Sequence, residues 1–88
     1  MNYLYSIAMV IIAITPVALA QSSLLENVKR NPKEAEVLCK QFRNLNAKGI
    51  SASSKANIDQ ISRQKNLSDT DAEILSIYVI GLYCPDVN

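Results

Sequence analysis

The sequence predicts an all-α fold, a small bundle of about four short helices clamped by one disulfide and preceded by a signal peptide. Apolar residues recur at helical spacing along most of the chain, and no stretch alternates apolar and polar residues as a strand would. The two cysteines are Cys39 and Cys84. At 88 residues the chain has room for one small domain. We therefore divide it into a signal peptide, 1–20, and a helical domain, 21–88.

The N-terminal segment has the organisation of an export signal. Residues 1–20 contain 16 apolar residues and no charged side chain. Ile7–Ile14 has a suitable length for an h-region, and Ala18-Leu19-Ala20 supplies small residues at positions −3 and −1 of a cleavage site. We expect cleavage after Ala20 and a periplasmic or secreted protein that then has no membrane association. The alternative is an uncleaved membrane anchor, because Tyr3–Ala20 is just long enough to span a bilayer core.

Two helices are expected in the first half of the domain. A short one begins at a cap on Ser22 or Ser23 and ends at Asn31-Pro32. The second has Asn31 as N-cap, Pro32 at the first helical position and Glu34 two residues later, which is a capping box. One face of this second helix is apolar, and Gly49 favours its end. That apolar face consists of Ala35, Leu38, Cys39, Phe42 and Leu45.

Two further helices are expected in the second half. A weaker one runs from about Lys55 to Lys65 after a cap from the polar segment 51–54, and its apolar contacts are Ala56, Ile58 and Ile61. The last helix has the strongest pattern. Ser68 caps it, Asp69 and Asp71 favour its positive N-terminal end, and Leu67 can pack on Ala72 as a hydrophobic staple. It continues to about Tyr83 and stops before Pro85.

The last helix is apolar on almost every side, which is typical of a helix buried among several neighbours. Between Ala72 and Gly81 only Glu73 and Ser76 are plainly polar. We interpret it as a central helix wrapped by the other three. The alternative is that part of it stays exposed as a partner or homodimer surface near Tyr78, Val79 and Tyr83.

Cys39 and Cys84 are interpreted as a structural disulfide, since two cysteines in a small exported chain usually pair. The bridge would close a loop of roughly 46 residues, which the chain-entropy model values at about 4 kcal/mol. A reactive thiol is the alternative, and it needs a neighbouring base or a Cys-x-x-Cys pair, neither of which the sequence contains.

Composition excludes several classes of chemistry, so we expect no enzyme and no cofactor. The absence of histidine removes Ser-His-Asp triads and Cys-His dyads, and two cysteines cannot form a four-thiolate zinc site. Asp69, Asp71 and Glu73 resemble the start of a calcium loop, but Ile74 and Ile80 occupy the positions that need Gly and Glu. Two glycines cannot supply a phosphate-binding loop.

Charge is distributed unevenly along the domain. Residues 21–65 hold nine basic and four acidic side chains, and residues 66–88 hold four acids and no base. This asymmetry could steer the protein to an anionic partner. The bases alternate with acids and polar residues, however, which favours a solvated helix exterior. Without a dense basic patch with interleaved aromatics, we expect no nucleic-acid binding.

The arrangement of motifs resembles a known family. The relevant features are Val37-Leu38-Cys39, the turn around Gly49, the helix start at Leu67-Ser68, and Tyr83-Cys84-Pro85. Together they look like the domain-of-unknown-function seven-hundred-thirty-two family of small exported bacterial proteins. The resemblance implies a helical fold clamped by Cys39–Cys84 and brings no catalytic residues.

The functional expectation is a non-enzymatic exported module that binds a partner or supports structure in the cell envelope or extracellular space. The partner is expected to be an unidentified protein or envelope component, or a second copy of the chain. The alternative is a small periplasmic chaperone-like or inhibitor protein that acts through its apolar last helix.

Overall fold

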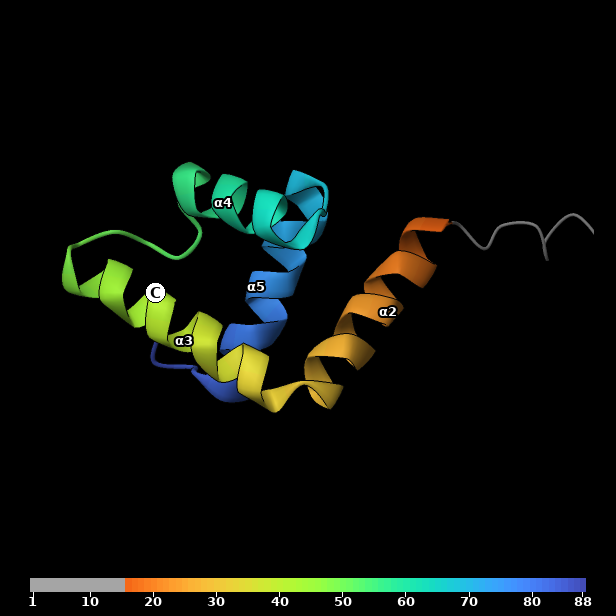
Figure 1. Cartoon of the computed structure of the whole chain (residues 1–88), viewed down its shortest axis with the longest axis horizontal. Coiled ribbons are helices and arrows are strands. Elements are labelled where there is room, and N and C mark those ends of the chain that lie inside the picture. Colours follow the sequence, from red (N-terminus) through yellow and green to blue (C-terminus); the bar gives the residue numbers. More distant parts are fainter. Residues whose placement is uncertain (1–15) are drawn as a thin grey trace, which may run out of the picture.

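The computed structural model describes residues 16–88, which form four helices connected by short loops (Figure 1). These are α2 (Pro16–Arg30), α3 (Pro32–Ala47), α4 (Lys55–Lys65) and α5 (Asp69–Tyr83). No strand occurs between residues 16 and 88, so the predicted all-α class is confirmed. The predicted h-region, Ile7–Ile14, lies outside the described residues.

Helix α2 begins earlier than expected. Pro16 is its first residue, a position that tolerates proline because the N–H there has no helical partner. The predicted cap at Ser22 or Ser23 is wrong, since both serines lie within the helix. The predicted cleavage position after Ala20 also falls inside α2 in the intact chain. The helix ends at Arg30 as expected, because the residue before a proline disfavours helical dihedral angles.

The junction between α2 and α3 differs from a capping box. Pro32 occupies the first helical position as predicted, but the Asn31 side chain makes no capping hydrogen bond. Its Nδ2 instead donates to the main-chain oxygen of Asn27 at 2.7 Å. Glu34 forms an ion pair with Lys65 at the end of α4. At this junction Asn31 therefore binds back to the end of α2, and Glu34 connects α3 to α4.

The caps of α4 and α5 form as predicted. The Ser54 hydroxyl accepts a hydrogen bond from the main-chain N–H of Asn57 at 3.3 Å, and the Ser68 hydroxyl accepts one from Asp71 at 3.1 Å. Between the two helices, Asn66 has a φ of 54°, in the left-handed region that asparagine tolerates and that commonly ends a helix. Local sequence thus accounts for this whole turn.

Helix α5 is the centre of the fold, because α2, α3 and α4 all contact it. The predicted apolar face of α3 is buried against it, except that Leu45 is half-buried. The largest fully buried side chains come from four different segments and are Phe42, Ile61, Val79 and Cys84. The core is therefore a junction of helix faces around α5.

In α4 one buried position was wrongly predicted. Ala56 is exposed, and the neighbouring Asn57 is buried. Burial of an amide is tolerated only when the amide is hydrogen-bonded, and Asn57 Nδ2 donates to the main-chain oxygen of Ala52 at 2.6 Å. This bond holds the 51–54 connector against the helix that it precedes.

Candidate functional site

A disulfide between Cys39 and Cys84 joins α3 to the end of α5, with the two Cα atoms 6.0 Å apart. Both cysteines are buried, and neither is free. The predicted structural disulfide is confirmed, and the alternative of a reactive thiol has no cysteine left to supply it.

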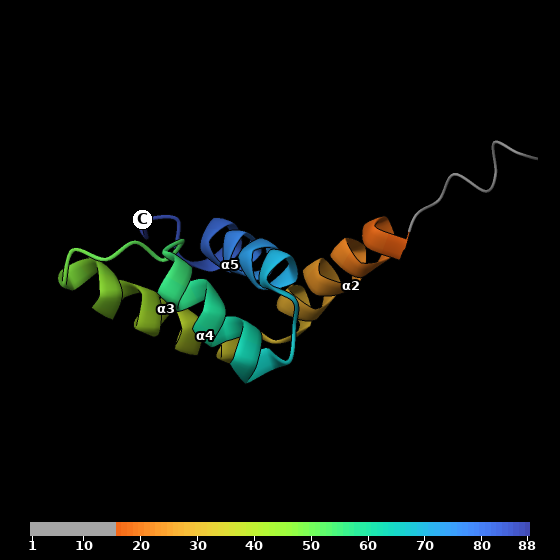
Figure 2. The same ribbon diagram turned by 90° about the horizontal axis from the view of Figure 1, so that it is seen from above.

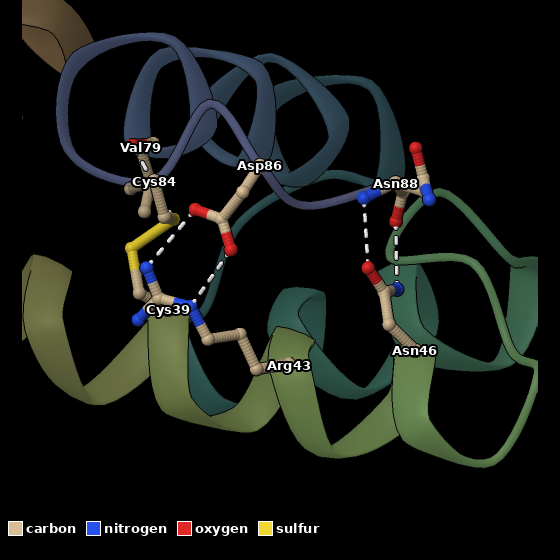
Figure 3. Close-up of polar contacts among 7 residues, drawn as sticks. All are labelled: Cys39, Arg43, Asn46, Val79, Cys84, Asp86 and Asn88. Carbon is tan, nitrogen blue, oxygen red and sulfur yellow. Dashed lines mark hydrogen bonds and ion pairs between the residues drawn. A yellow bond between two sulfur atoms is a disulfide. The ribbon is translucent and has the colours of Figure 1, made fainter.

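The disulfide is the first of three contacts that hold the C-terminal segment 84–88 on α3 (Figure 3). Cys39, Arg43 and Asn46 are four and three residues apart, so they lie along one stripe of the helix. In order, they bind alternate residues of the segment, Cys84, Asp86 and Asn88. We call these three contacts the C-terminal clamp.

In the middle of the clamp, the Arg43 guanidinium and the Asp86 carboxylate form a two-pronged ion pair. Nε and one terminal nitrogen each donate to a different carboxylate oxygen at 3.0 Å. These hydrogen bonds lower the pKa of Asp86 below its ordinary value and raise that of Arg43. Because both side chains are more than half exposed, solvent and salt weaken the pair.

At the end of the clamp, Asn46 and Asn88 exchange hydrogen bonds. Asn46 Oδ1 accepts from the Asn88 N–H at 2.8 Å, and Asn46 Nδ2 donates to the main-chain oxygen of Asn88 at 3.0 Å. The N–H of Ala52 donates to that same oxygen at 2.8 Å. Val87, between these anchors, is buried. Segment 84–88 is therefore fixed on the folded domain, with Cys84 and Val87 in its core and the residues between and after them at the surface.

A cavity of about 110 Å³ lies where α2 meets α3 and α5. It is much smaller than the several hundred Å³ of a typical small-molecule site. The Glu34–Lys65 ion pair lies at its lining. The other residues that line it are Leu24, Asn27, Val28, Asn31, Ala35, Leu38, Leu67, Leu75 and Val79. We interpret this space as imperfect packing beneath α2.

An open groove runs beside α2 and has a volume of about 460 Å³. Its walls are mainly exposed polar side chains from α2 and the start of α5. The lining residues are Ser23, Leu24, Glu26, Asn27, Arg30, Leu67 and Asp71. Within the described part of the chain, every buried side-chain nitrogen and oxygen atom has a hydrogen-bond partner.

The three predicted partner-surface residues occupy different environments. Val79 is 1% exposed and belongs to the core, so including it in a surface was wrong. Tyr78 and Tyr83 are half-buried and pack against the core. The Tyr83 hydroxyl donates to the main-chain oxygen of Val28 at 3.2 Å, which ties α5 to α2. This side of α5 therefore serves mainly internal packing.

Ile77 is the most exposed large apolar residue of α5 and lies on the opposite side from Val79, whereas Leu82, which is 49% exposed, does not share the side of Ile77. Figure 2 shows α5 along one edge of the molecule, with α3 and α4 on its other side. Ile77 is 59% exposed. Glu73 and Gly81, one turn on either side, are also exposed, and Ile74 and Ile80 are half-buried flanks. We call these five residues the outer face of α5.

The sequence did not predict the outer face because two neighbouring residues of α5 are placed against their polarity: a serine is buried and an isoleucine is exposed. Ser76 is buried, with its hydroxyl donating to the main-chain oxygen of Ala72 at 3.0 Å, whereas Ile77 points outward. The available signal was the helical spacing of 72, 75, 76, 79 and 83, which places these residues on one side and Ile77 on the other.

No three potential metal ligands cluster between residues 16 and 88. None of the helices α2 to α5 combines the length and apolar character that a membrane crossing requires.

Comparison with known proteins places the chain in a family. The family model described as Domain of unknown function (DUF8664) matches residues 25–84. The chain belongs to this family. The DUF8664 match includes α3, α4, α5 and both cysteines of the disulfide. Searches of the curated proteins and of the solved structures gave no match. The expected membership in a family of unknown function is confirmed, and the particular family named by the resemblance is not.

Proposed function

We propose that this DUF8664 chain is a non-enzymatic exported module that binds another polypeptide through the outer face of α5. The observation that carries the proposal is the 59% exposure of Ile77 on the helix that otherwise forms the centre of the core. Ile74, Ile77 and Gly81 follow one another at intervals of three and four residues, which is the spacing of a helix–helix seam.

A non-enzymatic role is supported by the structural role of the charged side chains whose pKa values are shifted. The pair with shifted pKa values, Arg43 and Asp86, is occupied in holding segment 84–88. The cavity beneath α2 is too small for an ordinary substrate.

Export is supported by the Cys39–Cys84 disulfide, because such bonds persist in oxidising compartments. The test is the mass of the protein recovered from the periplasm or medium of an expressing bacterium. We expect a chain that begins at Gln21 and is two hydrogens lighter than its reduced form. A full-length chain in the membrane fraction would support the anchor alternative instead, and free thiols would contradict the exported state.

We further propose that DUF8664 is related to the seven-hundred-thirty-two family of unknown function. The support is the shared frame of one helix cysteine and a final Tyr83-Cys84-Pro85. Structures of members of both families should superimpose around the disulfide, with the equivalent of α5 at the centre. Different helix connections around the bridge would show the shared frame to be coincidental.

Binding through α5 is tested by replacing Ile77 with a photo-crosslinking amino acid in cells that export the protein. Val37 is the matched control, because it is an apolar residue of α3 with a similar exposure of 54%. We expect one discrete adduct from position 77 and none from position 37. Equal labelling from both positions, or none from position 77, would overturn the proposal. A ladder of adducts of many sizes would favour the chaperone-like alternative.

A further inference from the structure

Gly81 lies in the last turn of α5 with no internal reason to be a glycine. It is exposed, it belongs to a regular helix, and a Cβ atom added there would meet no atom of residues 16–88 within 4 Å. Its φ is not positive, in contrast to Gly49 with a φ of +76° in a turn. Glycine within a helix is less stable than alanine. The missing side chain therefore points to a contact from outside the chain.

The outer face of α5 holds a bulky residue that fits this gap. Ile74 and Gly81 are seven residues apart, with Ile77 between them. If a second α5 packs antiparallel to the first, with the two-fold axis near Ile77, residues on either side of the axis exchange places. Ile74 of each copy then lies over Gly81 of the other, and the two Ile77 side chains meet at the centre.

We propose that the partner of the outer face is a second copy of this chain, paired antiparallel through α5. This inference rests on the proposed function and identifies its partner. Ile74 and the space at Gly81 belong to the same side of the same helix. In a two-fold pair the contact between Ile74 of one copy and Gly81 of the other therefore occurs twice, as a two-fold interface requires. A parallel pair would instead place the two Gly81 residues against each other and leave a void.

Charge also favours the antiparallel arrangement over a parallel one. Helix α5 carries Asp69, Asp71 and Glu73 near its start and no basic residue. Parallel pairing would bring these acids of the two copies together, and like charges side by side are unfavourable. Antiparallel pairing separates them to opposite ends of the contact.

The stripe from Ile74 to Gly81 spans two helical turns, so one helix pair supplies the interface. Such a contact belongs to the smallest size class of protein interfaces. We therefore expect a weak dimer, with a dissociation constant on the order of 10–100 µM.

Sedimentation equilibrium of the purified chain with its disulfide formed tests the pairing. We expect a monomer–dimer equilibrium, and at least a tenfold increase in the dissociation constant for Ile77→Asp and for Gly81→Leu. Val37→Asp is the matched control and should leave the equilibrium unchanged. Circular dichroism verifies the fold of each variant, and the exposure of both replaced residues makes unfolding unexpected.

The orientation is tested by mixing Ile74→Cys protein with Gly81→Cys protein under mild oxidation. Antiparallel pairing predicts that the mixed disulfide forms faster than either symmetric one. Preferred formation of the symmetric disulfides would overturn the proposed register.

A chain that stays monomeric up to millimolar concentration would overturn the self-pairing. In that case a discrete photo-adduct at position 77 with a different protein would leave the proposed function standing. A dimer that is insensitive to both α5 variants would also overturn this inference, because its interface would lie elsewhere.

Discussion

At the scale of single residues, substitutions at Gly81 distinguish the folding stability of one chain from the association of two chains. Gly81→Ala should stabilise the monomer by about 0.5–1 kcal/mol, because alanine loses less backbone entropy in a helix and the added methyl group meets no neighbour. Chemical denaturation at low micromolar concentration measures this gain. A loss of monomer stability would mean that the space at Gly81 is already occupied within the chain.

Asp86 provides a pH-dependent prediction. Its folded-state pKa lies below the ordinary value of about 3.9, so its contribution to stability is present above that pH and is lost as the pH falls through the folded-state pKa. Asp86→Asn should therefore lower the unfolding midpoint at pH 7 and have a smaller effect near pH 2. Urea denaturation at both pH values measures the difference.

The control for this prediction is Arg43→Gln combined with Asp86→Asn. If the ion pair carries the effect, the double variant should lose less stability at pH 7 than the sum of the losses of the two single variants, whereas exact additivity would contradict it. A difference between the wild type and Asp86→Asn that persists unchanged at pH 2 would contradict the role of the ionised carboxylate.

At the scale of elements, a helix cap whose side chain forms a capping hydrogen bond should contribute more to stability than one whose side chain does not. Ser68→Ala should cost about 1 kcal/mol, because the Ser68 hydroxyl satisfies the otherwise unpaired N–H of Asp71 at the start of α5. Asn31→Ala is the comparison, since its side chain forms no capping bond, and its cost should be smaller. Thermal unfolding of both variants gives the ranking, and an equal or reversed order would contradict it.

The elements also indicate where local sequence is sufficient. The starts of α4 and α5 were predicted correctly because Ser54 and Ser68 act on N–H groups three residues away. The start of α2 was not, because serines also occur inside helices when the preceding residues are good helix formers, as Ala18, Leu19 and Ala20 are.

At the scale of the whole molecule, the disulfide links two parts of the core that lie far apart along the chain. It closes a loop between residues separated by 45 positions, so replacing both cysteines by alanine should cost about 4 kcal/mol in the chain-entropy model. That is a large part of the stability of so small a domain. Urea denaturation of the double variant measures the loss.

The matched comparison is the wild-type chain after reduction, which should be destabilised by a similar amount. A double variant that loses less than about 1 kcal/mol would show that the rest of the C-terminal clamp and the core suffice without the bridge. The Arg43–Asp86 and Asn46–Asn88 contacts would then be the parts that hold segment 84–88.

The sequence by itself determined the all-α class, the disulfide, the caps of α4 and α5, and the apolar face of α3. Each depends on nearby residues or on the scarcity of cysteine. Only the tertiary structure decided that Val79 and Ser76 face inward, that Ile77 faces outward, and that segment 84–88 is clamped to α3. The reason is that a helix apolar on nearly every side has too little contrast between apolar and polar positions for its spacing alone to orient it. Its rotation is set by the three helices that pack around it, and so is the surface that remains free.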